Sequence, residues 1–172
     1  MDDTDSPLLE SLRDYENILP ILGRIAIFGG LDEKELGIVF QNLQKVRYAR
    51  GQIICKQGDL GRFIYIVKKG RAKMYLEESY TALELVEYSI GDCFGETALI
   101  GILPHSATVE AVEDSELIVL SGKNLYDLYK HDIDVYCKVL LNITRETCRR
   151  LASTDNVLQH YVMDEKKRGQ IH

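Results

Sequence analysis

The chain of 172 residues lacks the patterns that mark most metal sites, membrane spans and nucleic-acid surfaces. Its four cysteines include no C-x-x-C pair, so we expect reduced, mostly buried thiols and no metal site. No apolar run approaches the ~20 residues that cross a bilayer, and the acidic start MDDTDSPLLE is unlike a secretory signal. The net charge of −6 leaves no basic footprint for nucleic acid. These absences predict a cytoplasmic protein with no membrane or nucleic-acid partner.

Catalytic motifs are also missing from the sequence. It contains no G-x-S-x-G elbow, no Walker-type phosphate loop and no H-E-x-x-H pair. Of the four histidines, only His105 lies in the β-rich part, whereas a cupin-type metalloenzyme needs two or more with a carboxylate. We therefore expect no enzymatic activity, no metal ion and no cofactor.

The spacing of apolar residues divides the chain into a helical start, a β-rich middle and a helical end. Two helices are predicted first, one over residues 6–27 and one after Asp32, where Glu35 completes a capping-box pattern. Between residues 46 and 122, short β-type runs are separated by glycines, which predicts seven or eight strands. Because few helices interrupt them, we expect a mainly β fold, an antiparallel β-roll or jelly-roll barrel with flanking helices.

The helical period returns at Lys123 and predicts a short helix, followed by a long one from Asp132 to Val162. The length suits one domain with flanking helices. We divide the chain into an N-terminal helical segment (1–27), a β-roll with its leading helix (28–122), C-terminal helices that include a dimerisation helix (123–163) and a disordered tail (164–172).

The stretch GDCFGETALIGILPHSATVEA, residues 91–111, holds the polar residues of greatest interest. Gly95 and Glu96 precede one apolar turn, whose first backbone N–H groups make a cradle for an anion, and Ser106 can close that cradle. A carboxylate beside an anion is unfavourable unless the ligand also offers hydroxyl groups. A phosphate carried on a ribose meets both demands.

Together with GQIICKQGDLGRFIYIVKKG, this stretch resembles the cyclic nucleotide-binding domain family. That family includes bacterial cAMP receptor transcription factors, protein kinase A regulatory subunits and nucleotide-gated channels. The resemblance runs from about Phe28 to Val162 and rests on the glycine spacing and the cassette F-G-E-x-A-L-x…P-x-[SA]-A-T. It implies a sensor domain in signal transduction, with cAMP or cGMP as its ligand.

The resemblance also implies roles for the matching residues. Glu96 would accept a hydrogen bond from the ribose 2′-hydroxyl, and Ser106 would donate one to the cyclic phosphate. In the last helix, CRRLASTDN resembles the bacterial stretch that contacts the purine across a dimer. The implied ligand-binding residues are Gly95, Glu96, Thr97, Ala98, His105, Ser106, Ala107, Thr154 and Asp155. Other interpretations stay open. Glu96 can instead cap the short helix that it begins, and Thr154 and Asp155 can lie on a solvated face of the last helix.

One position departs from the family pattern. The family has arginine after the proline, and this sequence has His105. Arginine brings a permanent charge and a planar fork, whereas histidine is charged only below about pH 6.5. Loss of a charge-assisted hydrogen bond, roughly 1.5–3 kcal/mol, weakens binding roughly 10- to 150-fold. Two hypotheses follow: a sensor that binds cAMP, or an interaction module of the same fold that binds no nucleotide, with His105 on the pocket rim.

The last helix carries two apolar stripes. One follows a heptad through Cys137, Leu140, Thr144, Thr147, Leu151, Thr154, Leu158 and Tyr161, and the other contains Tyr136, Val139 and Ile143. A helix with two apolar sides can pack on its own barrel and on a partner at once. We expect a parallel homodimer that acts through an unidentified effector protein; the alternative is a seam against the chain's own barrel alone. The residues after Asp132 are too few for the winged helix-turn-helix of the transcription-factor relatives, so we expect no DNA binding.

Overall fold

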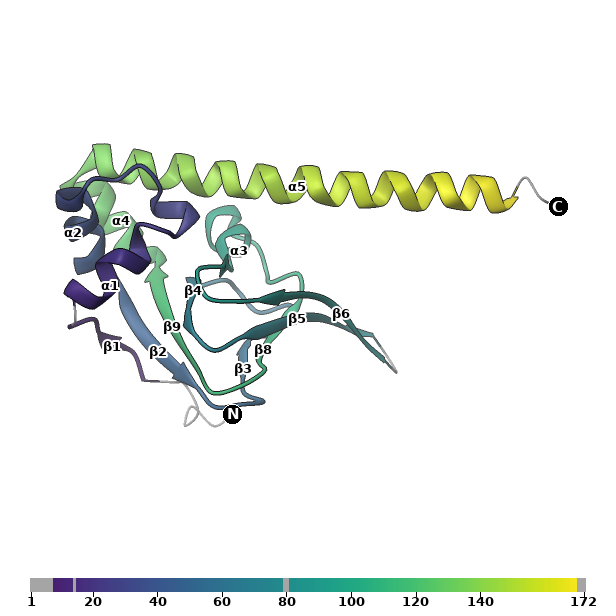
Figure 1. Cartoon of the computed structure of the whole chain (residues 1–172), viewed down its shortest axis with the longest axis horizontal. Coiled ribbons are helices and arrows are strands. Elements are labelled where there is room, and N and C mark those ends of the chain that lie inside the picture. The colour runs from purple at the N-terminus through teal and green to yellow at the C-terminus, as the bar shows by residue number, and fades with distance from the viewer. Residues whose placement is uncertain (1–7, 14, 79–80, 170–172) are drawn as a thin grey trace.

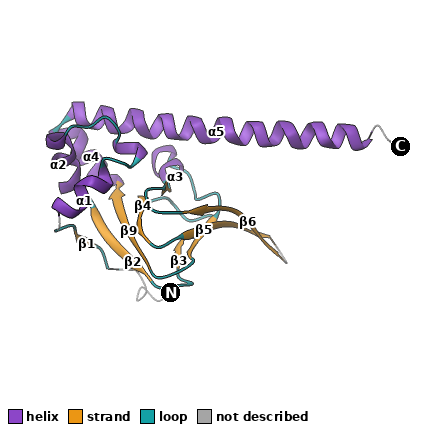
Figure 2. Cartoon of the chain, viewed as in Figure 1, coloured by secondary structure: helices purple, strands orange, loops and turns teal. Residues whose placement is uncertain are grey.

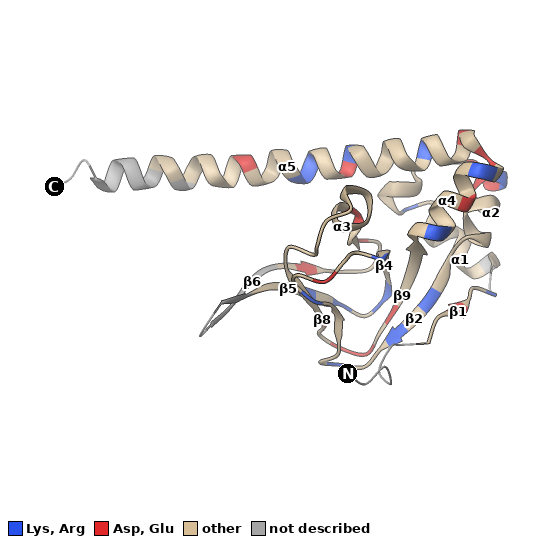
Figure 3. Cartoon of the chain, turned by 180° about the vertical axis from the view of Figure 1, so that it is seen from behind, with Lys and Arg blue, Asp and Glu red and all other residues tan. Residues whose placement is uncertain are grey.

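The computed structural model describes residues 8–13, 15–78 and 81–169. Two antiparallel sheets form a β-roll, and one long helix runs across it and continues past its edge (Figure 1). Helices α1 (Tyr15–Leu22), α2 (Glu33–Gln41) and α4 (Gly122–His131) gather at one end of the sheets (Figure 2). Basic and acidic residues are interspersed over the described elements rather than collected in one patch (Figure 3). The structure confirms the predicted fold class.

The N-terminal segment differs from the single helix predicted over residues 6–27. It contains strand β1 (Glu10–Ser11), helix α1 (Tyr15–Leu22) and the 3₁₀ turn η1 (Ala26–Phe28). Strand β1 pairs with β2 (Gln44–Tyr48), and Lys45 Nζ lies 3.1 Å from Glu10 Oε2. Glu10 and Ser11 therefore join the sheet because of a partner strand more than thirty positions away, which apolar spacing does not reveal. Residues 6 and 7 lie outside the described ranges.

Helix α2 (Glu33–Gln41) begins as the sequence predicts. Asp32 Oδ1 accepts a hydrogen bond from the Glu35 backbone N–H at 2.9 Å, and the Asp32 N–H donates to Glu35 Oε2 at 3.0 Å. These two bonds complete the capping box and satisfy N–H groups that a helix start leaves free.

The described residues contain nine strands, because β1 adds to the seven or eight expected. The remaining strands are β3 (Ile53–Cys55), β4 (Phe63–Lys69), β5 (Ala72–Glu78), β6 (Thr81–Tyr88), β7 (Cys93–Phe94), β8 (Thr108–Ala111) and β9 (Ser115–Ser121). One sheet has the order β1-β2-β9-β4-β7, and the other has the order β3-β8-β5-β6. Strand β4, between β9 and β7, is buried on both faces, with Ile64 and Ile66 against the helices and Tyr65 and Val67 inside the roll. This alternation follows from the two-residue period of a strand.

Three helices follow or interrupt the strands: α3 (Glu96–Gly101), α4 (Gly122–His131) and α5 (Ile133–Gly169). Helix α5 rests on the body through Val135, Val139 and Ile143, which are all buried. It continues to Gly169, although we expected a disordered tail from residue 164. Glutamate, lysine and arginine, which fill much of that stretch, are good helix formers. Residues 170–172 lie outside the described ranges.

The cysteines only partly meet the expectation of buried thiols. Cys55 and Cys93 are buried, and burial raises the pKa of each to about 12, so both thiols stay protonated. Cys137 and Cys148 are exposed on α5, because they lie on the side of the helix that faces away from the body. Among the described helices, none combines the length and apolar character that a bilayer crossing requires.

Candidate functional site

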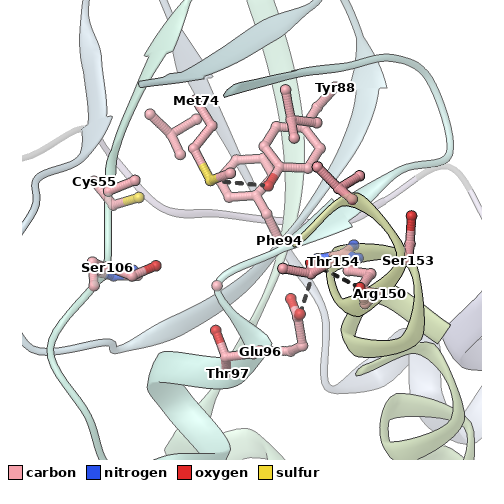
Figure 4. Close-up of a pocket in the computed structure, with 16 residues that line it drawn as sticks. Cys55, Met74, Tyr88, Phe94, Glu96, Thr97, Ser106, Arg150, Ser153 and Thr154 are labelled. Carbon is pink, nitrogen blue, oxygen red and sulfur yellow. Dashed lines mark hydrogen bonds and ion pairs between the residues drawn. The ribbon is translucent and has the colours of Figure 1, made fainter. Parts of the chain in front are cut away.

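A pocket of about 650 Å³ opens between the inner wall of the β-roll, helix α3 and the middle of α5 (Figure 4). Its walls are formed by Cys55, Met74, Val86, Tyr88, Phe94, Gly95, Glu96, Thr97, His105, Ser106, Ala107, Val109, Arg150, Ser153, Thr154 and Val157. A volume of this size suits a small organic ligand. Seven of the nine predicted site residues therefore lie together in one cavity.

Glycines bring α3 close to the strands. Gly95 has φ +85°, and a Cβ atom at this position would lie 2.7 Å from the backbone oxygen of Phe63. At Gly61 a Cβ atom would lie 2.5 Å from the Cβ of Ala98. Only glycine meets both the backbone conformation and the space at Gly95. The turn therefore directs Glu96, the first residue of α3, into the pocket.

Glu96 is a buried carboxylate that the protein satisfies only in part. The residue is 1% exposed, and its Oε1 accepts a hydrogen bond from Arg150 Nη1 at 2.9 Å. Its Oε2 is buried and has no hydrogen-bond partner among the described residues. A buried charged oxygen without a donor is costly, so this atom is suited to a hydrogen bond from a ligand.

Arg150 ties α5 to the wall of the pocket. Its guanidinium pairs with Glu96 and also donates to the backbone oxygen of Cys93, while Nε lies 3.6 Å from Glu146 Oε1. Burial, the largest single effect, lowers the pKa of Arg150, but the charges of Glu96 and Glu146 together with Cys93 and Tyr88 outweigh it, and the pKa is raised. Sequence reasoning missed this residue. The available signal was that a buried Glu96 requires a cation, and the stretch CRRLASTDN offers two.

His105 lies beside Ser106 and is 9% exposed, so it is not an exposed residue on the rim. Its backbone N–H donates to the backbone oxygen of Asp59 at 2.8 Å, and its backbone oxygen accepts from the Gly58 N–H at 2.9 Å. Burial lowers the pKa of the imidazole, and the carboxylate of Asp59 opposes that shift only in part. The side chain is therefore neutral near pH 7.

Two predicted residues do not line the pocket. Ala98 is buried against Gly61, because the helical turn points it away from the cavity that Thr97 faces. Asp155 is exposed on α5, about 100° around the helix from Thr154, which does line the pocket. Gly95, Ser106 and Ala107 lie at the wall as expected.

The apolar wall was not predicted from the sequence as part of the site. Phe94 stacks on Tyr65 with ring centroids 5.1 Å apart and on Tyr88 at 4.7 Å. The Tyr88 hydroxyl lies 3.5 Å from the Met74 sulfur, and Figure 4 shows both above the polar residues. These side chains resemble an ordinary barrel core in sequence, and only the tertiary structure shows that they enclose a cavity.

The pattern of the cyclic nucleotide-binding domain matches residues 45–132, which is 88 of the 172 residues and runs from β2 to the end of α4. The chain belongs to the cyclic nucleotide-binding domain family. It is 39% identical over 114 residues to a cAMP-dependent protein kinase regulatory subunit from Dictyostelium discoideum, a match that covers 66% of this chain and 35% of that protein. The chain thus spans about a third of that relative's length.

Two solved structures of the family share the fold. A cyclic nucleotide-binding domain from Methylobacillus flagellatus has a TM-score of 0.75 and 24% identity, and the match covers 89% of this chain and 87% of that one. The regulatory domain of Toxoplasma gondii PKA, solved with cAMP, has a TM-score of 0.63 and 28% identity, with coverage of 77% and 50%. Helix α5, which carries Arg150 and Thr154, lies outside the matched family region.

Proposed function

We propose that this chain is a regulatory domain that binds a cyclic purine ribonucleotide, cAMP, and performs no catalysis. The unpaired oxygen of Glu96 carries the proposal. With Oε1 held by Arg150, Oε2 is buried without a donor, and a ribose 2′-hydroxyl would supply one. A buried acceptor that gains a partner recovers roughly 1–3 kcal/mol.

The rest of the pocket offers complementary groups for such a ligand. The apolar wall of Met74, Tyr88 and Val157 suits a purine ring. The Ser106 hydroxyl can donate to a phosphate oxygen. Thr154 Oγ1 donates to the Arg150 backbone oxygen at 3.0 Å, so its lone pairs remain to accept from a purine amino group. The relative from Toxoplasma gondii, solved with cAMP, supports cAMP as the ligand.

Calorimetric titration with cAMP and cGMP at pH 6 tests the proposal. Replacing Glu96 with alanine should weaken cAMP binding about 5- to 150-fold, because the ribose hydroxyl loses its acceptor. Glu96→Gln keeps the shape of the side chain and separates binding from folding. Glu110→Gln is a matched control, because Glu110 pairs with Lys73 on the sheet at 3.6 Å and does not line the pocket.

Two outcomes contradict the proposal. Unchanged affinity in the Glu96 variants would leave this residue with a structural role as the partner of Arg150; the alternative of a helix cap is wrong, because Gly95 is the N-cap of α3 and no side chain caps that helix. Absence of binding by cAMP and by cGMP at millimolar concentration would favour the alternative, a module of the same fold without a nucleotide. The observation that favours this alternative is His105, a neutral side chain where the family has a charged arginine.

The output of the domain, in this proposal, is a homodimer through α5 that presents a surface to an effector protein. The expected seam contains Cys137, Thr144, Leu151 and Leu158, and all four residues are exposed. Leu140 and Thr147, which we expected in the same heptad, are half-buried towards the body. Exposed Leu141 and Val162 extend the apolar stripe on the outer side. A projecting helix with such a stripe is marginal alone in water and gains stability from a second helix.

A further inference from the structure

The walls of the pocket have no net charge at neutral pH. Two of the lining residues are ionised, Glu96 and Arg150, and they pair with each other. Arg150 also donates to the backbone oxygen of Cys93 and lies near Glu146, so its charge is already shared among acceptors. An anionic ligand would therefore enter a cavity that holds no uncommitted cation among its described lining residues.

The end of the pocket that would receive a phosphate is neutral. Figure 4 shows Ser106 on the opposite side of the cavity from Arg150. His105, next to Ser106, is buried, and burial lowers the pKa of its imidazole below the ordinary value near 6.5. The charged group that acts on it is the carboxylate of Asp59, in the loop between β3 and β4. A phosphate at this end would meet neutral donors and a negative charge nearby.

Hydroxyl groups fit this end of the pocket better than an oxyanion does. A neutral imidazole has one donor and one acceptor, and the Ser106 hydroxyl both donates and accepts. A ligand hydroxyl can satisfy both roles, whereas a phosphate oxygen only accepts. A nucleoside also keeps its ribose, whose 2′-hydroxyl would meet Glu96 Oε2, and its base, which would meet the apolar wall.

We propose that the pocket also binds an uncharged purine ribonucleoside, with adenosine as the simplest example, and that at pH 7.5 it binds adenosine at least as tightly as cAMP. The inference rests on the proposed function, because both ligands would place the ribose and the base in the same way. The two ligands differ at the phosphate end of the pocket, where burial of a charge without a counter-ion weakens the binding of cAMP and not that of adenosine.

Calorimetric titration of the whole chain with adenosine, 2′-deoxyadenosine and cAMP tests this inference. At pH 7.5 adenosine should bind at least as tightly as cAMP, and 2′-deoxyadenosine should bind about 5-fold or more weakly because Glu96 Oε2 loses its donor. Between pH 7.5 and pH 6.0, cAMP should bind more tightly as His105 takes up a proton, while adenosine should change by less than about twofold.

A change of charge at position 105 provides a second test of the inference. His105→Arg should tighten cAMP binding about 10-fold or more at pH 7.5, and it should not tighten adenosine binding. His131→Arg is a matched control that adds the same charge on α4, where the exposed His131 ring lies 2.7 Å from the Asp127 backbone oxygen of the same helix and does not line the pocket. It should leave both affinities unchanged.

The outcomes separate the inference from the function on which it rests. Tighter binding of cAMP than of adenosine at pH 7.5 overturns the inference and leaves the proposed function intact. Absence of binding by all three ligands at millimolar concentration overturns both. Equal affinity for adenosine and 2′-deoxyadenosine overturns the contact between the ribose 2′-hydroxyl and Glu96 Oε2, on which the proposed function and the inference both depend. An unchanged ratio of the two affinities in His105→Arg shows that position 105 does not set the preference, which also overturns the inference.

Discussion

The contact between Arg150 and Glu96 joins α5 to α3, and its removal gives a measurable prediction. Glu96 is 1% exposed, and in Arg150→Ala its carboxylate loses the donor that the described residues supply. Removal of one partner from a fully buried ion pair costs roughly 3–5 kcal/mol. The side chain of Arg150 is 35% exposed, so water can reach part of the site, and we expect a loss of about 2 kcal/mol. For a chain of this size that loss lowers Tm by about 4–8 °C.

Urea unfolding followed by circular dichroism measures this loss in ligand-free protein. Glu96→Gln removes the charge that needs a partner, so adding Arg150→Ala to it should cost about 1 kcal/mol less than in the wild type. Arg149→Ala is the control: this neighbour is on the same helix, is 64% exposed and pairs with Glu146, and its loss should cost less than about 0.5 kcal/mol.

Additivity of the two single changes, within about 0.5 kcal/mol, would refute the reasoning, because a shared contact produces coupling. An Arg150→Ala protein as stable as Arg149→Ala would do the same. Either result would mean that the carboxylate finds water or another donor when the guanidinium is removed.

Three further predictions concern the α3 turn, the dimer and pH. Gly95→Ala should destabilise the protein by about 1–2 kcal/mol more than Gly51→Ala in urea unfolding. Both glycines have positive φ, but only at Gly95 would the added Cβ lie 2.7 Å from the Phe63 backbone oxygen. Equal losses of stability would contradict this prediction. Light scattering at about 100 μM should show a dimer of the wild type. Leu151→Asp places a charge on the exposed apolar stripe and should give a monomer. A monomeric wild type would exclude the proposed dimer. Because the pKa of His105 is lowered in the folded state, the unfolded chain binds a proton first as pH falls through about 6.5. The free energy of unfolding should therefore fall more between pH 7.5 and 5.5 in the wild type than in His105→Gln, and equal losses would show that the imidazole is not desolvated.

Local features of the chain were predictable because their causes lie within a few residues. The capping box at Asp32 and Glu35 depends on a spacing of three, and the structure has both hydrogen bonds. The two-residue alternation in FIYIV predicts a strand, and the glycines mark turns such as Gly70, at φ +86°. The glycine spacing together with the cassette from Phe94 to Thr108 predicted the family and the fold, and the family pattern matches residues 45–132.

Partners that come together from distant parts of the chain were decided by the tertiary structure. Glu10 and Ser11 lie in a stretch with the apolar spacing of a helix but pair with β2, because the sheet edge offers backbone hydrogen bonds that local sequence does not encode. The exposure of Cys137 and Cys148 depends on which side of α5 rests on the body. Residue type alone therefore predicted burial that the packing of α5 does not provide.

The candidate site shows the same division. The sequence by itself determined that Glu96 follows a glycine turn and that histidine stands where the family has arginine. Only the tertiary structure decided that Glu96 keeps one oxygen without a donor, that Arg150, fifty-four positions further along, holds the other, and that His105 is buried beside Asp59. A carboxylate and an imidazole have one chemistry in the sequence, but their charge and their free hydrogen-bonding atoms depend on burial and on neighbours that folding brings from other elements.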